Sequence, residues 1–142
     1  MYSQSLVFAQ FALIGLIIVL SQGLFSNLGA LVVLGVSVLF GLWVLAYNRL
    51  GNFNIRPELK EGCVLITTGP YKLVRHPMYT AVMLFCLAFV VATPSYVVVS
   101  SFALLFVVLG LKAVREEGLW CAENEAYRAY MKVSKRFIPF IY

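Results

Sequence analysis

Two long stretches of this chain contain no charged residue, and they constrain its fold more than any other feature. Residues 1–48 and 77–111 lack Asp, Glu, Lys and Arg, in a sequence that is 62% hydrophobic. Such stretches are typical of membrane-spanning helices, since about 20 apolar residues cross the hydrocarbon core. They leave no room for a large soluble domain. We therefore expect one all-α domain over residues 1–142, an integral membrane bundle with a small cytoplasmic cap.

The two uncharged stretches accommodate four spans. We place these spans at residues 6–20, 28–47, 77–92 and 96–111. The Thr-Pro-Ser sequence at residues 93–95 favours a tight turn, so the last two spans should form a helical hairpin. In the second span, Ser37 and Gly41 form a small-xxx-small pair, which allows another helix to approach closely. The sequence thus predicts about four transmembrane helices.

The positive charges indicate the orientation of these spans. Every Lys and Arg lies between residues 49 and 75 or between residues 112 and 136. Cytoplasmic segments of membrane proteins carry an excess of positive residues, so both segments and both termini are expected in the cytoplasm. The net charge of +5 then reflects topology and attraction to anionic membrane lipids. No basic stripe interleaved with aromatic residues is present, so no nucleic-acid partner is expected.

The only histidine lies in a polar block directly before the third span, Gly-Pro-Tyr-Lys-Leu-Val-Arg-His-Pro-Met-Tyr at residues 69–79. The proline after this histidine fits the first turn of a helix, because its missing N–H is no loss there. A helix start presents unpaired N–H groups and the positive end of the helix dipole, which suit a carboxylate or phosphate. Together with Glu116 and Glu117, Arg75 and His76 therefore suggest a ligand site at the cytoplasmic mouth of the bundle.

Each of these residues also has a purely structural interpretation. His76 alone would serve as a helix cap or a headgroup contact. Glu116 and Glu117 would form a solvated helix face paired with Lys112 at helical spacing. The three cysteines are scattered and the chain has one histidine, so neither a disulfide framework nor a metal site is expected.

Two classes of protein other than an enzyme remain open. Four short spans also describe small transport proteins, but those need an ionisable residue within a span, and none of the four spans contains one. A non-catalytic membrane scaffold gives no reason for an Arg-His-Pro-x-Tyr block and a Glu pair in the same chain. Both classes rank below an enzyme.

Taken together, the polar motifs resemble one group of membrane enzymes. Gly-Pro-Tyr-x-x-x-Arg-His-Pro-x-Tyr is followed by a helical hairpin, by Glu-Glu, by Tyr-x-x-Tyr-Met and by Arg-Phe-Ile-Pro. This order resembles the isoprenylcysteine carboxyl methyltransferases, and the related phospholipid N-methyltransferases share it. The resemblance covers roughly residues 54–142. It implies a helical membrane enzyme that uses S-adenosylmethionine (SAM) without a Rossmann domain, and the chain has no GxGxxG.

The resemblance also implies roles for individual residues. The residues that would line the SAM site are Arg56, Cys63, Val64, Leu65, Ile66, Tyr71, Arg75, His76, Pro77, Met78 and Tyr79, the stretch from Cys63 to Ile66 through its backbone. Glu116 would hold the positive amino group of SAM. The residues with a catalytic role would be His76, Glu116 and Glu117. Lys112 and Arg136 would hold the methyl-accepting substrate.

The chemistry of SAM agrees with this set of residues. SAM carries a sulfonium, an amine and a carboxylate, so its site needs an acid, an anion-binding element and an aromatic or apolar wall. Methyl transfer is an in-line displacement in which positioning and desolvation provide much of the rate. A base is optional, and His76 is suited to that role if the acceptor is an amine or thiol.

The expected function is therefore SAM-dependent methylation of a lipid-like or membrane-associated acceptor, with S-adenosylhomocysteine as the product. The resemblance favours an enzyme like the isoprenylcysteine carboxyl methyltransferases. Phospholipid or amine N-methylation is the alternative, because Lys112 stands where those carboxyl methyltransferases have arginine. Lysine lacks the planar fork that suits a carboxylate.

Overall fold

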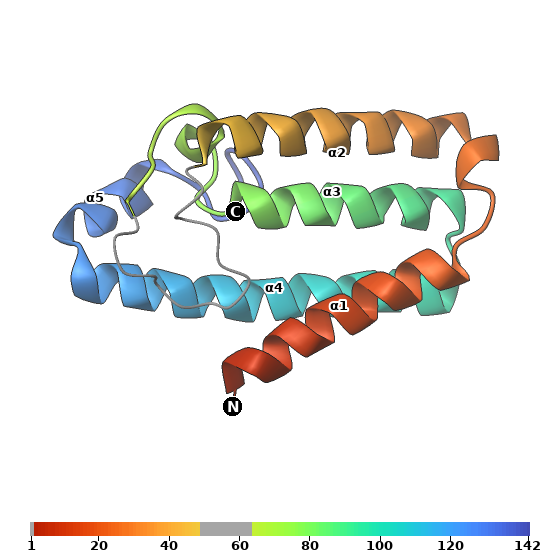
Figure 1. Cartoon of the computed structure of the whole chain (residues 1–142), viewed down its shortest axis with the longest axis horizontal. Helices are drawn as coiled ribbons and strands as arrows, with labels where there is room; N and C mark the ends of the chain where they lie inside the picture. Colours follow the sequence, from red (N-terminus) through yellow and green to blue (C-terminus); the bar gives the residue numbers. More distant parts are fainter. Residues whose placement is uncertain (1, 49–63) are drawn as a thin grey trace.

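The computed structural model describes residues 2–48 and 64–142, and this described part contains five α-helices (Figure 1). Their bounds are α1 Tyr2–Leu20, α2 Leu28–Tyr47, α3 Pro77–Ala92, α4 Tyr96–Glu123 and α5 Glu125–Val133. Two short 3-10 helices accompany them, η1 at Leu24–Ser26 and η3 at Gly69–Lys72. No strand occurs among the described residues. The prediction of an all-α membrane bundle is confirmed.

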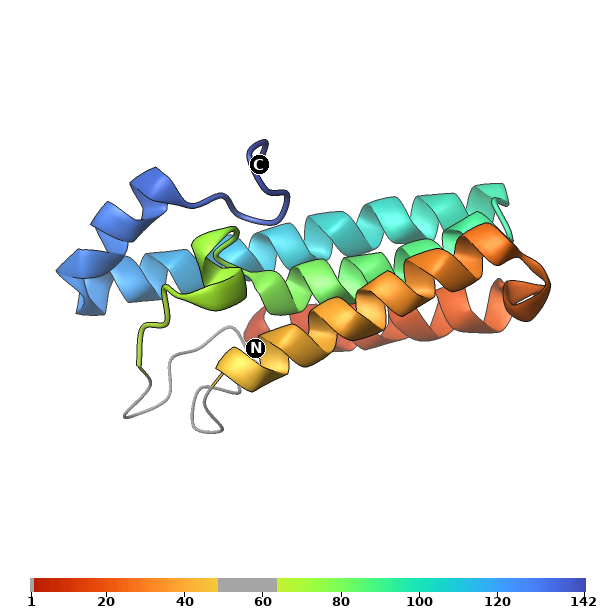
Figure 2. The ribbon, with the colours of Figure 1, turned by 90° about the horizontal axis from the view of Figure 1, so that it is seen from above.

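The first four helices run side by side and form the bundle (Figures 1 and 2). α2 packs mainly on α3, α1 packs mainly on α4, and contacts between α3 and α4 join the two pairs. The α1–α2 and α3–α4 connections lie at one end of the bundle. The start of α1, the end of α4 and all of α5 lie toward the other end, which also holds the polar block before α3.

Among the described residues, three helices are long and apolar enough to cross a membrane: Ser3–Leu20, Leu28–Tyr47 and Tyr96–Glu123. α3 is an apolar helix of only 16 residues, about 24 Å long at 1.5 Å per residue, whereas the hydrocarbon core is about 30 Å thick. The bundle exposes many large apolar side chains, including Phe8, Leu39 and Val107. A surface of this kind is suited to lipid.

The small residues of α2 allow a close approach to α3. The Ser37 hydroxyl donates to the Ala81 carbonyl at 3.2 Å. A Cβ added to Gly41 would lie 4.0 Å from the Ala81 Cβ, in ordinary contact. Ser37 and Gly41 thus both face Ala81 of α3, on the side of α2 where the pair predicts a helix contact. At the far end, the Ser95 hydroxyl caps α4 by accepting from the Val98 N–H, which agrees with the predicted turn between the two helices.

α4 continues well beyond the apolar stretch, as the absence of a helix breaker before Gly118 predicts. Its extension carries Lys112, Glu116 and Glu117 and then supports α5, whose first turn is capped by the Asn124 side chain. α5 buries a tyrosine face on the end of α4. The ring of Tyr127 stacks on that of Trp120 with their centroids 5.7 Å apart.

Candidate active site

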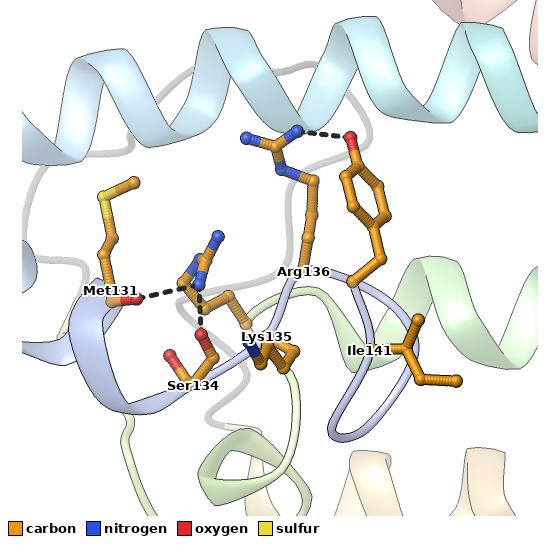
Figure 3. A pocket seen from close by; sticks show the side chains of 7 residues that line it. Met131, Ser134, Lys135, Arg136 and Ile141 are labelled. Carbon is orange, nitrogen blue, oxygen red and sulfur yellow. Dashed lines mark hydrogen bonds between the residues drawn. The ribbon is translucent and has the colours of Figure 1, made fainter.

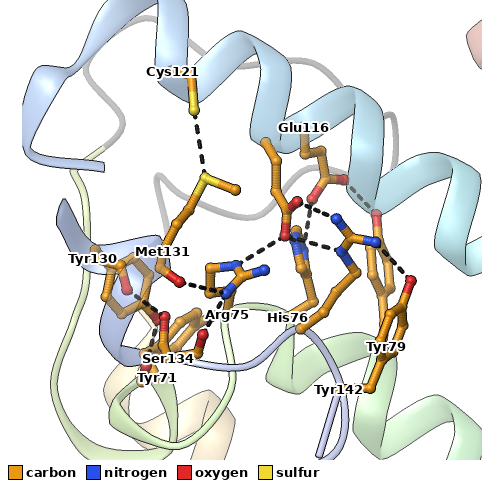
Figure 4. A network of polar contacts seen from close by, with 12 residues as sticks. Tyr71, Arg75, His76, Tyr79, Glu116, Cys121, Tyr130, Met131, Ser134 and Tyr142 are labelled. Atoms are coloured by element: carbon orange, nitrogen blue, oxygen red, sulfur yellow. Dashed lines mark hydrogen bonds and ion pairs between the residues drawn. The ribbon is translucent and has the colours of Figure 1, made fainter. Parts of the chain in front are cut away.

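A polar network lies at the end of the bundle where α3 begins (Figure 4). His76 immediately precedes α3, and Pro77 occupies its first turn as predicted. The His76 residue is only 7% exposed, and its side chain makes no capping hydrogen bond to the helix. His76 thus occupies the N-cap position of α3 through its backbone, while its ring serves other partners.

Backbone pairing brings the C-terminal segment to His76. The Arg75 N–H donates to the Lys135 carbonyl at 2.7 Å, and the His76 N–H donates to the Arg136 carbonyl at 3.1 Å. The ring of the next residue, Phe137, is buried with its centroid 5.9 Å from that of His76. Segments about 60 residues apart in the sequence thus meet at one helix start.

Glu117 is the centre of the charged part of this network. Its Oε1 accepts from Arg75 Nε at 2.9 Å, and its Oε2 accepts from Arg136 Nη2 at 2.7 Å. His76 Nε2 lies 3.2 Å from Oε1. The Glu117 side chain is only 5% exposed, so three groups that carry or can carry positive charge surround a buried carboxylate. A solvated helix face is therefore the wrong interpretation for Glu117.

The His76 ring lies between the two acids. Its Nδ1 is 3.3 Å from Glu116 Oε2 and its Nε2 is 3.2 Å from Glu117 Oε1. A neutral imidazole has only one N–H, so a protonated ring matches two flanking carboxylates best. Burial lowers the pKa of His76, but hydrogen bonds to Glu116 and Glu117 outweigh burial and raise this pKa above its ordinary value. The arrangement favours an imidazolium that orients both acids.

Glu116 differs from Glu117 in having fewer cationic partners and a more exposed side chain. Its side chain is 19% exposed. Glu116 Oε1 accepts from the Tyr79 hydroxyl, while its Oε2 faces His76. The Tyr79 ring stacks on the His76 ring with centroids 5.5 Å apart and planes 11° apart. Glu116 is therefore a carboxylate held in place by neighbours beside an aromatic wall.

Lys112 lies one helical turn before Glu116 and is almost completely buried. Its ammonium is 5.1 Å from the centre of the Tyr79 ring. The ammonium also donates to Gln10 Oε1, which comes from α1. Sequence reasoning did not single out Gln10. The feature that could have revealed it is that Gln10 is the only polar side chain in the predicted span 6–20.

Arg136 borders an open pocket of about 250 Å³ (Figure 3). Its guanidinium donates to the Tyr142 hydroxyl at 2.7 Å and lies 5.3 Å from the centre of that ring. The residues that line this pocket are Arg75, Met131, Ser134, Lys135, Arg136, Ile141 and Tyr142. Basic groups and an apolar wall thus meet beside Glu117.

A model of the phospholipid methyltransferase family matches residues 27–124. The chain belongs to the phospholipid methyltransferase family. The match covers more than half of the sequence, including α2, α3 and α4, and it confirms the resemblance drawn from the polar motifs. None of the curated proteins matches the chain.

Family membership indicates a membrane methyltransferase, and the matched segment contains the core of the polar network. His76, Glu116 and Glu117 all fall within residues 27–124. α1 and α5 lie outside the match. In this member of the phospholipid methyltransferase family, Gln10 and Arg136 therefore reach the network from segments that the family model does not cover.

The remaining predicted site residues occupy varied positions. Burial and the nearby Glu116 carboxylate raise the pKa of Tyr71 to about 12, and the Tyr71 carbonyl accepts from the Tyr130 hydroxyl. Pro77 is buried and Met78 half-buried in the first turn of α3. The stretch from Val64 to Ile66 is irregular and precedes η3. Two predicted residues, Arg56 and Cys63, lie outside the described residues.

Within the described part of the chain, no three His, Cys, Asp or Glu side chains are grouped so as to hold a metal ion. The acids and His76 satisfy one another and the neighbouring arginines instead. The site chemistry is thus that of an ion-pair network beside aromatic rings.

Proposed function

We propose that this protein is a SAM-dependent methyltransferase that acts on a lipid-like acceptor in the membrane. Family membership supports methyl transfer. The observation that supports the cofactor site is the difference between the two adjacent acids. Glu117 is engaged by two arginines and His76, whereas Glu116 is partly exposed and fixed by the Tyr79 hydroxyl. Glu116 is thus the carboxylate suited to receive the ammonium of a ligand.

The residues of this site fit the chemical groups of SAM. Glu116 provides an acid for the ammonium, and the basic side chains around Arg136 provide partners for the carboxylate. Tyr71 and Tyr79 provide aromatic surface for the rest of the molecule. When bound, SAM supplies an electrophilic methyl group on its sulfonium. The positions of these partners support the predicted cofactor site.

The network around His76 would position the reacting groups and exclude water. As an imidazolium, His76 donates to Glu116 and Glu117 and fixes the carboxylate of Glu116. Phe137 covers the rings of His76 and Tyr79 on one side. Positioning and desolvation are the contributions that an in-line methyl displacement needs most. We therefore assign His76 an orienting role in preference to that of a general base.

Lys112 supports a phospholipid over a prenylcysteine carboxylate as the acceptor. An ammonium binds phosphate as a point charge, and it lacks the planar fork with which arginine holds a carboxylate or a phosphate at two points. The phospholipid headgroup would then provide an amine for N-methylation. The distribution of positive residues supports a cytoplasmic position for the site and for both termini.

The direct test combines cofactor binding with turnover. Detergent-solubilised protein is titrated with S-adenosylhomocysteine by calorimetry, and labelled SAM is supplied with phosphatidylethanolamine or with N-acetyl-S-farnesylcysteine. We expect saturable binding of S-adenosylhomocysteine and label transfer to phosphatidylethanolamine. Transfer to the farnesylcysteine alone would overturn the choice of acceptor. No cofactor binding and no transfer would overturn the function.

A further inference from the structure

Residues 138–142 fold into a small apolar turn, the C-terminal hook. The Ile141 and Tyr142 N–H groups donate to the Ile138 carbonyl at 3.2 and 3.1 Å, and the Ile138 N–H donates to the Tyr142 carbonyl at 2.6 Å. At its tip, Phe140 has a φ of 67°, in the left-handed region that bulky residues rarely adopt. Phe140 is also 87% exposed. The hook thus closes on its own hydrogen bonds and presents a phenyl ring outwards.

The hook lies beside the apolar part of the bundle. The Tyr142 ring centroid is 6.3 Å from that of Phe106 on α4. The carbonyl of Phe137, directly before the hook, accepts from the Thr80 hydroxyl of α3 at 2.9 Å. Phe106 and Thr80 both belong to the uncharged stretch 77–111. Figures 1 and 2 show the hook level with the start of α3, whereas α5 lies further along the bundle axis. The hook is therefore at the level where the apolar helices leave the predicted hydrocarbon core.

The surface of the hook is apolar and continues the lipid-facing surface of the bundle. Besides Phe140, Ile141 is 76% exposed and Ile138 is 42% exposed. Close to Phe106 on α4, Val107 and Leu111 expose their side chains as well. An apolar surface of this kind at the edge of a membrane bundle is suited to lipid rather than to water.

The charges that flank the hook are complementary to anionic lipid. Residues 126–142 contain no Asp or Glu. The basic residues in this stretch are Arg128, Lys132, Lys135 and Arg136. Of these, Lys132 and Lys135 are exposed, and they stand closest in sequence to the hook. The nearest acids before this stretch, Glu123 and Glu125, are exposed at the far end of α5. Exposed lysines beside an apolar surface are typical of segments that lie in a membrane interface.

We propose that the C-terminal hook is an interfacial anchor. Phe140 and Ile141 insert into the leaflet at the polar end of the bundle, and Lys132 and Lys135 contact its anionic headgroups. The hook is linked to the candidate site, because the Tyr142 hydroxyl accepts from Arg136 at 2.7 Å. The anchor therefore holds the segment that carries Arg136 at the level of the headgroups. This role goes beyond the proposed function and holds whether or not the protein transfers methyl groups.

Spin labels measure the depth of the hook directly. Phe140→Cys and the control Ala126→Cys are made in a background whose three native cysteines are replaced by alanine. Ala126 is exposed in the first turn of α5, beside the end of α4, which extends about 18 Å past Leu111. Each labelled protein is placed in nanodiscs that contain phosphatidylglycerol. Collisions with oxygen, which dissolves in lipid, and with a water-soluble nickel chelate give the depth of the label.

We expect the label at position 140 to lie about 5–10 Å below the headgroup surface, and the label at position 126 to lie in water. Equal access of the chelate to both positions would overturn the anchor. Protection of position 140 from both oxygen and the chelate would overturn it too, because protein, for example a second copy of the chain, would then cover the hook.

A second pair of variants excludes insertion driven by the label, which is itself apolar. The label is placed by Ile141→Cys, with and without Phe140→Asn. Asparagine tolerates the left-handed region, so Phe140→Asn keeps the turn and removes the ring. We expect the label at position 141 to move towards the surface in the Phe140→Asn protein, with an unchanged unfolding midpoint. An unchanged depth would overturn insertion through Phe140.

The contribution of the two lysines is tested by lipid composition. The variant that combines Lys132→Gln and Lys135→Gln is labelled at position 141 and compared with the protein that keeps both lysines. We expect a shallower label in the double variant in nanodiscs that contain phosphatidylglycerol, and equal depths in nanodiscs of phosphatidylcholine alone. Equal depths of the two proteins in the anionic nanodiscs would overturn the contact between these lysines and anionic headgroups.

Discussion

Arg136 and Glu117 form a two-point ion pair between the C-terminal segment and α4. Arg136 Nε donates to Glu117 Oε1 at 3.2 Å, and Arg136 Nη2 donates to Glu117 Oε2 at 2.7 Å. Paired hydrogen bonds of this kind fix the relative orientation of both groups. Because Arg75 approaches the same carboxylate from the start of α3, Glu117 joins three segments of the chain that are distant in sequence.

Removing this carboxylate should destabilise the fold strongly. Glu117→Gln leaves Arg75, His76 and Arg136 close together without their buried counter-charge, and breaking such a buried pair costs about 3–5 kcal/mol. We expect a clear fall in the thermal unfolding midpoint of the detergent-solubilised protein. Glu123→Gln, at an exposed position near the end of α4, should leave the midpoint unchanged. Equal midpoints for the two variants would contradict a central role for Glu117.

Most of the fold follows from local features of the sequence. Pro77 begins α3 as its chemistry predicts, and the turn at residues 93–95 separates α3 from α4. The uncharged stretches identify the apolar helices, because the lack of charge that stabilises these helices in lipid can be read directly from the residue types. The relative packing of α1 on α4 and α2 on α3 is not visible in this way, since apolar faces are nearly uniform around each helix.

The candidate site could be predicted in part. The motifs and their spacing predict His76, Glu116 and Glu117 as site residues, and the structure places these three together. The sequence does not show which of the two acids has its carboxylate fully paired. This pairing depends on Arg136, which comes from the far end of the sequence. Gln10 was missed for a similar reason, since its partner is a lysine about 100 residues away.

The next prediction concerns the other acid. Glu116→Gln removes the carboxylate proposed to hold the ammonium of SAM, and a hydrogen bond to a charged group contributes about 1.5–3 kcal/mol, or roughly 10- to 150-fold in affinity. Calorimetric titration with S-adenosylhomocysteine measures the loss. The control Glu125→Gln removes an exposed acid on α5. Unchanged cofactor affinity in folded Glu116→Gln protein would count directly against Glu116 as the ligand of the ammonium.

The proposed orientation predicts opposite accessibility at the two ends of the bundle. Single cysteines are introduced at Ser26, in the α1–α2 connection, and at Lys132 on α5, in a background whose three native cysteines are replaced by alanine. Both positions are exposed. In sealed vesicles of known orientation, an impermeant maleimide should label only one of them from outside. Labelling of both from the same side would exclude the predicted topology.

The last prediction concerns the protonation of His76, which can be followed without interference because it is the only histidine in the chain. Burial lowers its pKa, but Glu116 and Glu117 raise it by more, so the net shift is upward from 6.5. A raised pKa in the folded state means that the imidazolium contributes stability fully below pH 6.5. This contribution is lost as the pH rises through the folded-state pKa.

Two measurements test the upward shift of the His76 pKa. NMR of protein labelled at the histidine ring should show titration above the ordinary pKa of 6.5, and the unfolding midpoint should fall as the pH rises through that value. His76→Gln cannot titrate there, so its midpoint should lack this component, and the difference between the two profiles isolates His76 from the tyrosines and lysines. An imidazole that titrates at or below 6.5 would show that the ring is neutral between its acids. His76 would then regain the role of general base in methyl transfer.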